Sequence, residues 1–581
     1  CEELQSINDN LFGYYTLTQD IDCSASGDFN DGEGFAPIGL TDSVLEAMSN
    51  GGGFDAIIAF NGTLDGQGHT INDIQVDLQG AVGGLFAFID GATVKNLTLE
   101  GGHVVGSSAQ DLTVYTDSPV TMVAGGLSAL AANSVIDNVT TNIDIKSTNN
   151  DGHVGLSAGL IGGIMPSAFG PGSLETSVSI TNSNALGDSA GYVTAGLVGA
   201  IIPADVLSIY MQGVTELDQP ENLQQALGSI GTRIDVDITD STTTGDLTCS
   251  ILCAGIVGIN GSDLNISNVT RSGNTGTFEK EISSDADPVL SIIEMFGPIS
   301  AGAIGINLPL SFNETPAMLA MNNVVINGAI NGTATAGLVG VSAPAIKVLI
   351  NSFIDSYSDM TQSDDGNSDA AFLDVLYSVL DTVSLTKSFN ISNVTVNAEN
   401  NCAVVCTGAS LINLGDGVFD NVNIVGQIAA VEMTDELSTN YGETLSMVAM
   451  FGPITAGFVG VNLPISTSDS GIGLVIKNSL VASDLSGTAA SGLVALSLPG
   501  ISVDVDQFQQ YFAPFWDAIS GNIEDRYREI YGDDLWNNET AQREMDQEFA
   551  TVYGGFGAYG ISVITGSTGL DIQNTRVEGD I

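Results

Sequence analysis

Short segments in which apolar and polar side chains alternate recur along the chain, each close to a glycine or an asparagine. Examples are residues 92–99 (ATVKNLTL), 135–140 (VIDNVT), 178–183 (VSITNS) and 264–270 (LNISNVT). Alternation with a period of two residues is typical of a β-strand with one buried face. Valine, isoleucine and threonine favour strands, whereas glycine and asparagine favour turns. The pattern predicts many short strands separated by tight turns.

The chain also repeats itself. Residues 290–311 are nearly rewritten 155 positions later at 445–466, and the same shift relates the segment that starts at Gly332 to the one that starts at Gly487. Within this unit an alanine or serine, a glycine and an apolar pair return every 35–70 residues or so, at Ala158-Gly159, Ala195-Gly196, Ala254-Gly255, Ala301-Gly302, Ala336-Gly337, Ala456-Gly457 and Ser491-Gly492. Such spacing is typical of stacked repeats, each of which buries its apolar face against its neighbours.

Composition selects the kind of repeat. The 581 residues include 70 glycines, and the repeats are rich in strand and turn residues rather than in helix formers. We therefore predict an all-β fold, a right-handed parallel β-helix solenoid with helical insertions between coils. Coils of such a solenoid lie about 4.8 Å apart, so about ten glycine motifs would form a rod of roughly 50 Å.

Helical spacing of apolar residues interrupts the strand pattern three times, which divides the chain. We expect an N-terminal block and first coils at 1–91, and three repeat units at 92–232, 233–385 and 386–552, followed by a C-terminal coil at 553–581. The predicted helical insertions lie at about 203–232, 345–385 and 503–550, and are marked by Leu223, Leu227 and Ile230, by Phe372, Leu376, Tyr377 and Leu380, and by Phe508, Phe512, Phe515, Trp516 and Ile519.

The third insertion concentrates aromatic side chains and holds Arg526, Arg528 and Arg543. Protein interfaces are rich in aromatic residues and arginine. The candidate interface comprises Phe508, Tyr511, Phe512, Phe515, Trp516, Tyr527, Tyr531 and Trp536. In the alternative, these side chains pack on the flank of their own β-helix.

The glycine motifs resemble the GLUG motif of bacterial and archaeal surface and secreted proteins. The resemblance rests on residues 83–86 (GGLF), 195–199 (AGLVG), 336–340 (AGLVG), 254–258 (AGIVG) and 456–460 (AGFVG), and on the N-terminal block with 15–23 (YTLTQDIDC) and 60–71 (FNGTLDGQGHTI). It implies a right-handed parallel β-helix, like the pectin-lyase-like and filamentous-haemagglutinin-like solenoids, at the cell surface or outside the cell. The family has no single reaction, so the resemblance says little about chemistry.

Charge limits the partners. The net charge is −57, because 69 acidic residues face only 12 lysines and arginines. A nucleic acid would be repelled, so we expect no nucleic-acid partner. We find no run of 18 apolar residues and expect no membrane span in this chain, with a signal peptide already removed. No cofactor is predicted, although calcium would suit an acidic exterior.

The six cysteines form three local pairs: Cys1 with Cys23, Cys249 with Cys253, and Cys402 with Cys406. The two C-x3-C motifs are expected about three coils, roughly 14 Å, apart, beyond the reach of a disulfide of about 7 Å between Cα atoms. Each motif should therefore close on itself at a tight corner of a coil. A metal site is the alternative, but no histidine lies nearby, and disulfides suit an oxidising compartment.

Candidate chemistry is sparse, and we predict neither catalytic nor metal-binding residues. Acidic groups such as Asp235, Asp237 and Asp240, or Asp364, Asp365 and Asp369, cannot be told by spacing from a solvated surface. Asp28, Asn30, Asp31 and Glu33 resemble a calcium loop, but Gly32 is misplaced for an EF-hand, so an N-terminal turn is the better interpretation. None of His69, His103 and His153 lies in an H-E-x-x-H motif.

Asn-x-Ser/Thr sequons are numerous, although asparagine and threonine are also natural turn and strand residues of this fold. The candidate glycosylation sites are Asn61, Asn96, Asn138, Asn265, Asn268, Asn313, Asn331, Asn390, Asn393 and Asn538.

The ends of a solenoid expose unpaired backbone groups that a cap or another subunit must cover. Leu4, Ile7 and Leu11 form an amphipathic stretch that could cap the first coil, whereas residues 569–581 resemble one more strand. We expect a non-enzymatic extracellular protein of the cell surface, either the subunit of a filament or sheath or the stalk of an adhesin. It would self-associate end to end or through 503–550, and host or surface glycans are further candidate partners. A carbohydrate-binding or carbohydrate-cleaving β-helix is the alternative.

Overall fold

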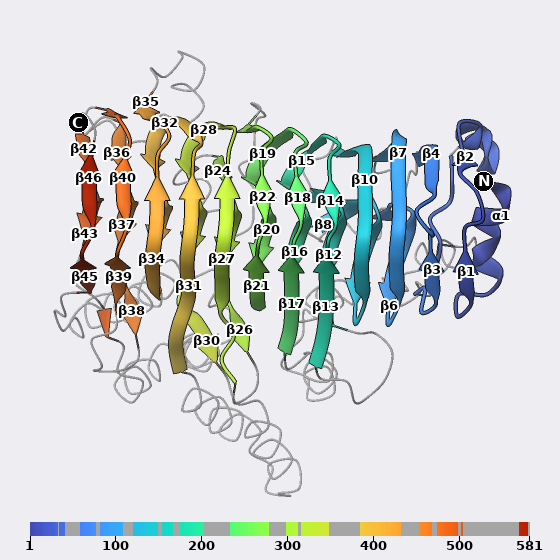
Figure 1. The fold of residues 1–581 in the computed structure, drawn as a ribbon, viewed down its shortest axis with the longest axis horizontal. Coiled ribbons are helices and arrows are strands. Elements are labelled where there is room, and N and C mark those ends of the chain that lie inside the picture. The colour runs from blue at the N-terminus through green and yellow to red at the C-terminus, as the bar shows by residue number, and fades with distance from the viewer. Residues whose placement is uncertain are drawn as a thin grey trace, which may run out of the picture.

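The chain winds into a long stack of coils (Figure 1). The structure is a computed structural model. It describes residues 1–32, 34–40, 59–76, 82–107, 120–148, 154–166, 175–202, 233–277, 298–311, 315–347, 384–430, 453–466, 473–487, 489–497, 501–502 and 569–578. Nearly all of the described elements are strands, and their principal pairings are parallel, as the repeat predicts.

Each complete coil contributes strands to five faces, which we number in chain order. The first face is an unbroken parallel ladder in which each strand pairs with its equivalent in the next coil. Its strands are β1 (Tyr14–Thr16), β3 (Thr63–Asp65), the start of β7 (Thr93–Ser107), the start of β10 (Val135–Thr148), β13 (Glu175–Thr181), β17 (Arg233–Thr239), β21 (Asp263–Ser267), the start of β27 (Leu319–Ile326), β31 (Ser384–Val396), the start of β34 (Asp416–Ile424), β39 (Leu474–Lys477) and β45 (Leu570–Gln573).

The second face follows after a sharp turn and is also parallel throughout. Its separate strands are β2 (Ile21–Asp22), β4 (Thr70–Val76), β14 (Asn184–Ala185), β18 (Thr242–Thr243), β22 (Thr270–Arg271), β40 (Leu480–Ala482) and β46 (Arg576–Glu578), and the later halves of β7, β10, β27, β31 and β34 complete it.

The third and fourth faces share several long strands that bend between them: β15 (Ser189–Ala195), β19 (Leu247–Ala254), β28 (Ala329–Ala336) and β32 (Glu399–Thr407). The third face adds the end of β10, β23 (Thr275–Thr277), β35 (Ile428–Ala430) and β41 (Leu485–Ser486). The fourth adds β5 (Val82–Gly83), β8 (Val120–Gly125), β11 (Val154–Ala158), β24 (Ile299–Ala301), β36 (Ile454–Ala456) and β42 (Ala489–Ser491).

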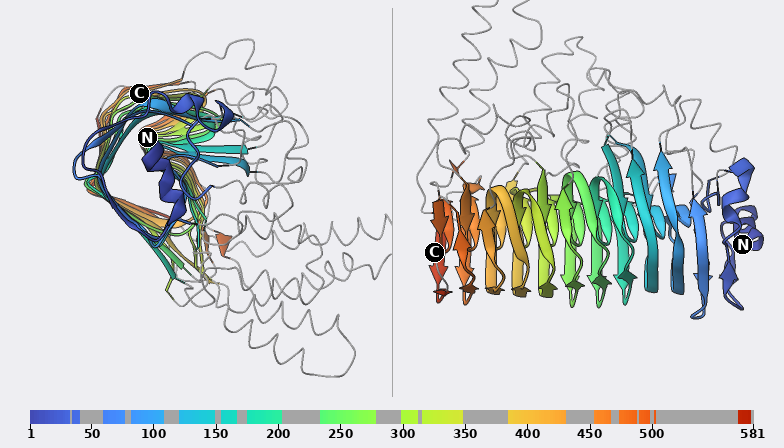
Figure 2. Two further views of the ribbon diagram at one scale, coloured as in Figure 1. Left: turned by 90° about the vertical axis from the view of Figure 1, so that its right-hand side faces the viewer. Right: turned by 90° about the horizontal axis from the view of Figure 1, so that it is seen from above.

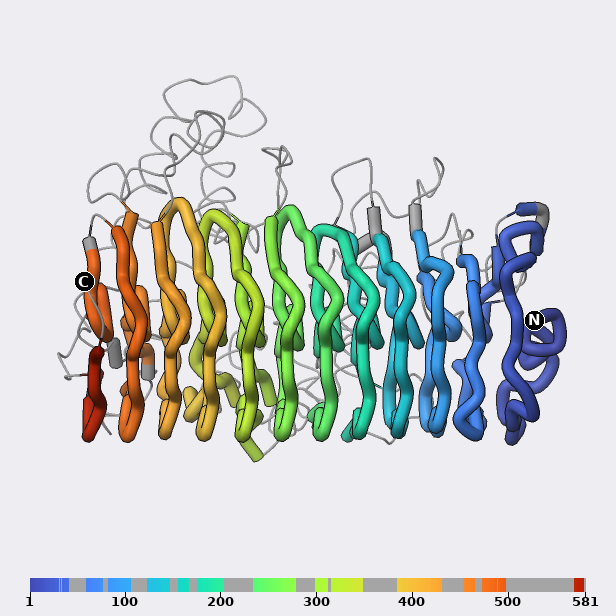
Figure 3. The backbone as a smooth tube through the Cα atoms, turned by 45° about the horizontal axis from the view of Figure 1, so that its top comes forward, coloured from blue at the N-terminus to red at the C-terminus, as the bar shows by residue number. Residues whose placement is uncertain are grey.

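The fifth face is a separate parallel sheet of ten strands in the described part of the chain. These are β6 (Phe86–Asp90), β9 (Ser128–Ala132), β12 (Ile161–Ile164), β16 (Val198–Ile201), β20 (Val257–Asn260), β25 (Ile304–Asn307), β29 (Val339–Ser342), β33 (Ser410–Asn413), β37 (Val459–Asn462) and β43 (Val494–Ser497). Seen along the stack, the faces enclose one central core (Figure 2). Seen from another side, successive coils follow one another without a break from the N-terminal end to the C-terminal end (Figure 3).

Four short strands lie at the edge of this frame. β26 (Leu310–Ser311) pairs with β30 (Ala345–Lys347), which runs antiparallel to the start of β31, and β38 (Ile465–Ser466) pairs with β44 (Ile501–Ser502). Of the predicted insertion at 345–385, the described residues 345–347 and 384–385 are therefore strand. The rest of that insertion lies outside the described residues, as do the whole of the insertions at 203–232 and 503–550.

One inward column of the first face shows how the core is built. Val94, Ile136, Ile180, Ile238 and Ile266 follow one another in register, and each side chain is buried. The alternation of the sequence produces this column, because every second side chain of a strand points to the same face. The column continues through Met321 and Ile391 to Phe419, whose ring centroid lies 4.9 Å from that of Phe389 in the neighbouring column.

The glycine motif turns the chain between the fourth and fifth faces. A Cβ atom added to Gly196 would collide with the carbonyl oxygen of Gly255, and one added to Gly255 would collide with that of Gly302. The same relationship joins Gly302 to Gly337, and Gly337 to Gly408. Each glycine of the motif is needed because the next coil's backbone occupies the place of its side chain. The motif is thus a stacked corner of the solenoid.

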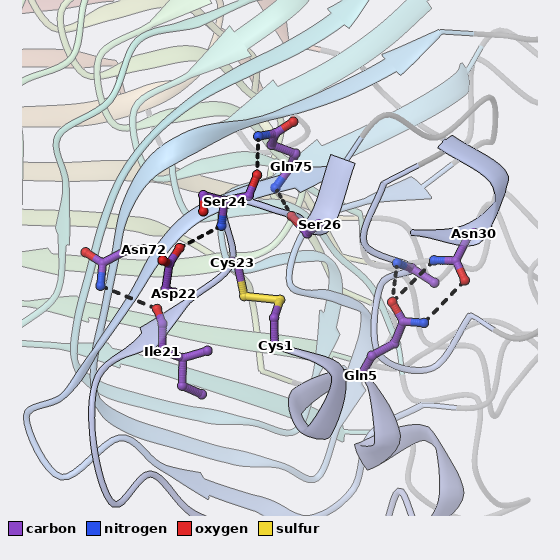
Figure 4. Close-up of a disulfide and its surroundings, with 11 residues drawn as sticks. Cys1, Gln5, Ile21, Asp22, Cys23, Ser24, Ser26, Asn30, Asn72 and Gln75 are labelled. Atoms are coloured by element: carbon purple, nitrogen blue, oxygen red, sulfur yellow. Dashed lines mark hydrogen bonds between the residues drawn. A yellow bond between two sulfur atoms is a disulfide. The ribbon is translucent and has the colours of Figure 1, made fainter. Parts of the chain in front are cut away.

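A small N-terminal cap covers the first coil. It contains helix α1 (Glu2–Gln5) and the 3₁₀ turns η1 (Ser6–Asp9), η2 (Ser26–Asp28) and η3 (Asn30–Gly32). Leu4, Ile7 and Leu11 are 3%, 4% and 6% exposed and belong to the core, as their amphipathic spacing predicts. A disulfide between Cys1 and Cys23 ties the start of α1 to the end of β2 (Figure 4).

Candidate functional site: the polar ladders of the solenoid

The turn between the first and second faces carries a row of residues in the left-handed conformation. Nearly all are asparagines, with φ angles between 45° and 57°. They are Asn96, Asn138, Asn182, Asp240, Asn268, Asn323, Asn393, Asn421, Asn478 and Asn574. Asparagine tolerates this conformation better than other residues with a side chain. Each coil therefore turns at an equivalent place.

Side-chain amides connect these residues along the rod. The Nδ2 of Asn138 donates to Oδ1 of Asn96 at 3.0 Å, and that of Asn268 to Oδ1 of Asp240 at 2.9 Å. Asn323 continues the row by donating to Asn268, and Asn574 by donating to Asn478. At Asn393 the row shifts by one residue, because its amide donates to Oδ1 of Asn322, at 2.8 Å, rather than to the left-handed residue Asn323. We call this row the asparagine ladder. It gives each turn a polar contact with the coil before it.

Acidic groups on the first face are engaged in structural contacts. The carboxylate of Asp65 accepts hydrogen bonds from Asn96 and from the backbone of Gln67, and lies 3.4 Å from Lys95. These contacts lower the pKa of Asp65, with the Asn96 hydrogen bond as the largest cause. Asp420 is held in the same way by Asn478 and Lys477, which lower its pKa. Such groups stay ionised at neutral pH.

The candidate carboxylates Asp235, Asp237 and Asp240 do not converge on one site. Asp235 lies 2.6 Å from Nε of Arg233, whose guanidinium also pairs with Asp263 in the next coil. Burial raises the pKa of Asp235, although Arg233 opposes the shift. Asp237 accepts from Asn265 at 3.1 Å, and Asp240 is part of the asparagine ladder. Asp237 and Asp240 thus join neighbouring coils, and Asp235 holds the arginine that does so. Asp364, Asp365 and Asp369 lie outside the described residues.

Arg271 is buried inside the corner between the second and third faces and is 1% exposed. Its guanidinium donates to the carbonyl oxygens of Gly245 at 2.6 Å and Asn274 at 2.7 Å. Burial lowers the pKa of Arg271 to about 10, against the opposing charges of Asp246 and Asp188. A buried cation needs such partners. Nothing in the sequence around Arg271 predicts that its side chain is buried.

Asp416 is a second buried group that the sequence did not reveal. It is 3% exposed, and its Oδ1 has no hydrogen-bond partner among the described residues. Burial raises the pKa of Asp416 to about 6. Lys387 is its register partner in β31, but no ion pair between the two side chains is formed in the described structure. The carboxylate of Asp416 is therefore an isolated titratable group inside the wall of the solenoid.

An inner row of amides and hydroxyls runs along the ends of the fifth-face strands. Asn260 donates to Asn307 at 2.8 Å, and Asn307 donates to Ser342 at 3.2 Å. Asn413 repeats the contact by donating to Asn462 at 2.9 Å, and Asn462 to Ser497 at 3.2 Å. Asn260, Asn307, Asn413 and Asn462 are fully buried. The row fills a polar corner of the core and fixes the register of neighbouring coils.

Both C-x3-C motifs lie where β19 and β32 bend from the third to the fourth face. The bonded pairs are Cys249 with Cys253 and Cys402 with Cys406, with Cα atoms 5.5 and 5.4 Å apart. Each pair lies at a register shift against the preceding strand, where the cysteine strand has one extra residue. The extra residue makes the corner at which two cysteines four positions apart can meet. The described cysteines include no free thiol.

The remaining candidates have local roles or lie elsewhere. Asn30 bridges the cap by contacts with Gln5 and the carbonyl of Gly34, as an N-terminal turn would. His69 lies 3.2 Å from Asp20, and His103 forms part of β7. Within the described residues, no group of three His, Cys, Asp or Glu side chains could hold a metal ion. The residues outside the description include His153, Glu33, Asn313, Asn538 and every member of the candidate interface: Phe508, Tyr511, Phe512, Phe515, Trp516, Tyr527, Tyr531 and Trp536.

None of the helices in the described part of the chain is long and apolar enough to span a membrane. No protein-family model matches the sequence. Over 152 residues, 26% of this chain, the sequence is 36% identical to halomucin of Haloquadratum walsbyi, and the match covers 1% of halomucin. The structure of an IgA1 protease aligns with 52% of this chain and 21% of its own, at 15% identity and a TM-score of 0.25, which establishes no common fold.

Proposed function

We propose that this chain is an extracellular structural protein in which a right-handed parallel β-helix serves as a stiff rod at the cell surface. The observation that carries the proposal is the unbroken parallel stack from β1 to β45. The right-handed sense follows from the strong preference of parallel strand connections for that hand. The GLUG-like glycine motif supports the same assignment.

Three further features support an extracellular location. Disulfides persist in oxidising compartments, and this chain has three. The high negative charge suits solubility in a salty medium. The partial similarity to halomucin concerns a fraction of that protein, so it supports a related repeat rather than a shared activity.

We propose further that rods associate end to end as subunits of a filament or sheath, with an adhesin stalk as the other form of the same role. Apolar side chains are exposed at both ends of the described stack. Phe12 and Tyr14 are 70% and 67% exposed near the first coil, and Leu496, Ile572 and Val577 are exposed in β43, β45 and β46. A second copy that covered these side chains would remove apolar surface from water.

Electron microscopy of the native protein at moderate salt tests this role, together with cell fractionation. We expect fibres in the extracellular fraction whose subunit repeat matches the rod length. Phe12→Ser and Ile572→Ser should shorten the fibres, whereas Val135→Ser, at an exposed apolar position with coils on both sides, should not. Single rods at every concentration would refute the filament and leave the stalk. Cleavage of a polysaccharide by the purified rod would instead support the carbohydrate-active alternative.

A further inference from the structure

Two pairs of sequons each lie within a single coil. The two asparagines of a pair differ in the side-chain contacts that they make. Strand β31 contains both Asn390 and Asn393. Strand β21 contains Asn265, and Asn268 follows one residue after its end. Each pair thus offers two sequons three residues apart on the same folded scaffold. Both asparagines of a pair satisfy the sequon motif, so a difference in glycosylation between them would come from their folded surroundings.

The second asparagine of each pair belongs to the asparagine ladder. Asn393 donates to Asn322 and accepts from Asn421, with both contacts at 2.8 Å. Asn268 donates to Asp240 and accepts from Asn323. Neighbouring coils are only about 4.8 Å apart, so a sugar on Nδ2 would have to displace the amide from its stack.

The first asparagine of each pair stands on an outward column of the first face. Asn390 is exposed, and its register partners are Ala320 in the coil before and Val418 in the coil after. Neither partner has a polar side chain, and the amide of Asn390 forms no hydrogen bond with a described residue. Asn265 is also exposed, but its Nδ2 donates to Oδ1 of Asp237 in the coil before at 3.1 Å, so its amide, like those of the ladder, is engaged between coils.

The hydroxyl of each of these two sequons lies on the same face as its asparagine. The middle residue, Ile391 or Ile266, points into the core and is fully buried, so Ser392 and Ser267 return to the outside. Two other sequons lack this arrangement. Thr333, two residues after Asn331, is 4% exposed, and the amide of Asn61 donates to the carbonyl of Asp90.

We propose that Asn390 is the acceptor of an asparagine-linked glycan in the described part of this rod, and that Asn265, Asn268 and Asn393, whose amides donate to a neighbouring coil, stay unmodified. The inference rests on the proposed extracellular location, because the chain must meet a glycosyl transferase during export. Asn390 stands between Ala320 and Val418 on an outward column, so its glycan would project from the first face.

The reaction balances with an activated lipid-phosphate-linked oligosaccharide as the donor. Nδ2 of the asparagine forms a bond to the anomeric carbon of the sugar, and the bond from that carbon to the phosphate oxygen breaks. The lipid phosphate leaves with the bonding electron pair, and Nδ2 loses one proton to a base of the transferase. An amide that no described residue holds, such as that of Asn390, can enter a transferase site without breaking a contact between the described coils.

Glycopeptide mass spectrometry of the full chain, purified from its native host, tests the proposal. We expect a sugar mass on the peptide that holds Asn390, localised by fragmentation to that residue rather than to Asn393. Glycans on Asn265, Asn268 or Asn393, or none at Asn390 in protein recovered from outside the cell, would overturn the assignment. Recovery of the protein from the cytoplasm would instead refute the proposed location.

Two variants separate attachment from stability. Asn390→Gln should remove one glycan and leave the denaturation midpoint of enzymatically or chemically deglycosylated protein unchanged. Asn393→Gln should keep the glycan at Asn390 and lower that midpoint, because it disrupts a ladder contact. If Asn393→Gln removed the glycan from a folded rod while Asn390→Gln did not, the assignment would be wrong.

Discussion

Asn323 donates its side-chain amide to Oδ1 of Asn268, 2.7 Å away in the preceding coil. Both residues adopt the left-handed conformation, with φ angles of 54° and 57°. One residue type therefore serves two purposes at this corner, since it tolerates the turn and bonds to the coil before it. The energies of the two purposes can be separated by substitution.

Asn323→Gly should cost about 1 kcal/mol of stability, because it removes one hydrogen bond and keeps a residue that accepts positive φ. Asn323→Ala should cost about 2 to 3 kcal/mol, because it also adds the strain of a left-handed alanine. Denaturant unfolding of the two variants and the parent protein measures both values. Equal losses would show that the conformational preference of asparagine contributes little.

The glycine corner predicts a much steeper response. Gly255→Ala would push its Cβ into the carbonyl of Gly302, so we expect a loss of about 3 kcal/mol and local distortion of two coils. Gly276→Ala is the matched control, because a Cβ at Gly276 would meet no atom within 4 Å. That variant should be neutral or slightly more stable. Hydrogen exchange of β20 and β25 would show whether the damage is confined to the corner, and a Gly255→Ala rod as stable as the control would contradict the stacking explanation.

The fold class was predictable because the stacked corner demands glycine in every coil, and a demand repeated at Gly196, Gly255 and Gly302 is visible in the sequence. The local cysteine pairs followed from the same stacking distance. The environment of single residues was not predictable in this way. Arg271 occupies an inward position that holds Thr243 in the coil before, and nothing in the order of residues shows that its guanidinium would find two carbonyl oxygens. The division of Asn390 and Asn393 between a free column and the ladder likewise depends on register with other coils.

Asp416 predicts a pH-dependent cost. Its pKa is raised to about 6 by burial, whereas that of the unfolded chain stays near 3.8. A carboxyl whose pKa rises on folding destabilises the fold when it is charged. The cost is therefore full above pH 6 and disappears as the pH falls towards 4. Asp416→Asn should raise the free energy of unfolding by about 2 kcal/mol at pH 7.5.

Unfolding of the Asp416→Asn variant and the parent protein at pH 7.5 and pH 4 measures this difference. The gain should shrink to a small fraction at pH 4, where the parent carboxyl is largely neutral in the folded state and roughly half neutral in the unfolded chain. Asp420→Asn serves as the control, because contacts with Asn478 and Lys477 lower the pKa of Asp420 and that variant should lose stability at pH 7.5. A loss of stability in Asp416→Asn at pH 7.5 would show that the buried carboxylate has a favourable role.

The disulfides should differ in the region that they protect. Cys1 and Cys23 are 22 residues apart, and Cys402 and Cys406 are 4 apart. Chain entropy assigns about 3 kcal/mol to the longer loop and about 2 kcal/mol to the shorter one. Replacing Cys1 and Cys23 by serine should increase hydrogen exchange in α1, β1 and β2, while the same change at Cys402 and Cys406 should affect the corner of β32. Exchange that rose equally along the whole rod in both variants would contradict this local effect.

The charge of the chain predicts that salt stabilises it. With a net charge of −57, folding brings many carboxylates together, and their repulsion weakens as ions screen it. The screening length falls from about 10 Å at 0.1 M to about 3 Å at 1 M ionic strength. We expect the midpoint of thermal unfolding to rise between these two NaCl concentrations at pH 7.5. The control is the same comparison near pH 4, where many carboxyl groups are protonated and the effect of salt should shrink. An equal rise at both pH values would instead assign the effect to the general action of salt on apolar surface.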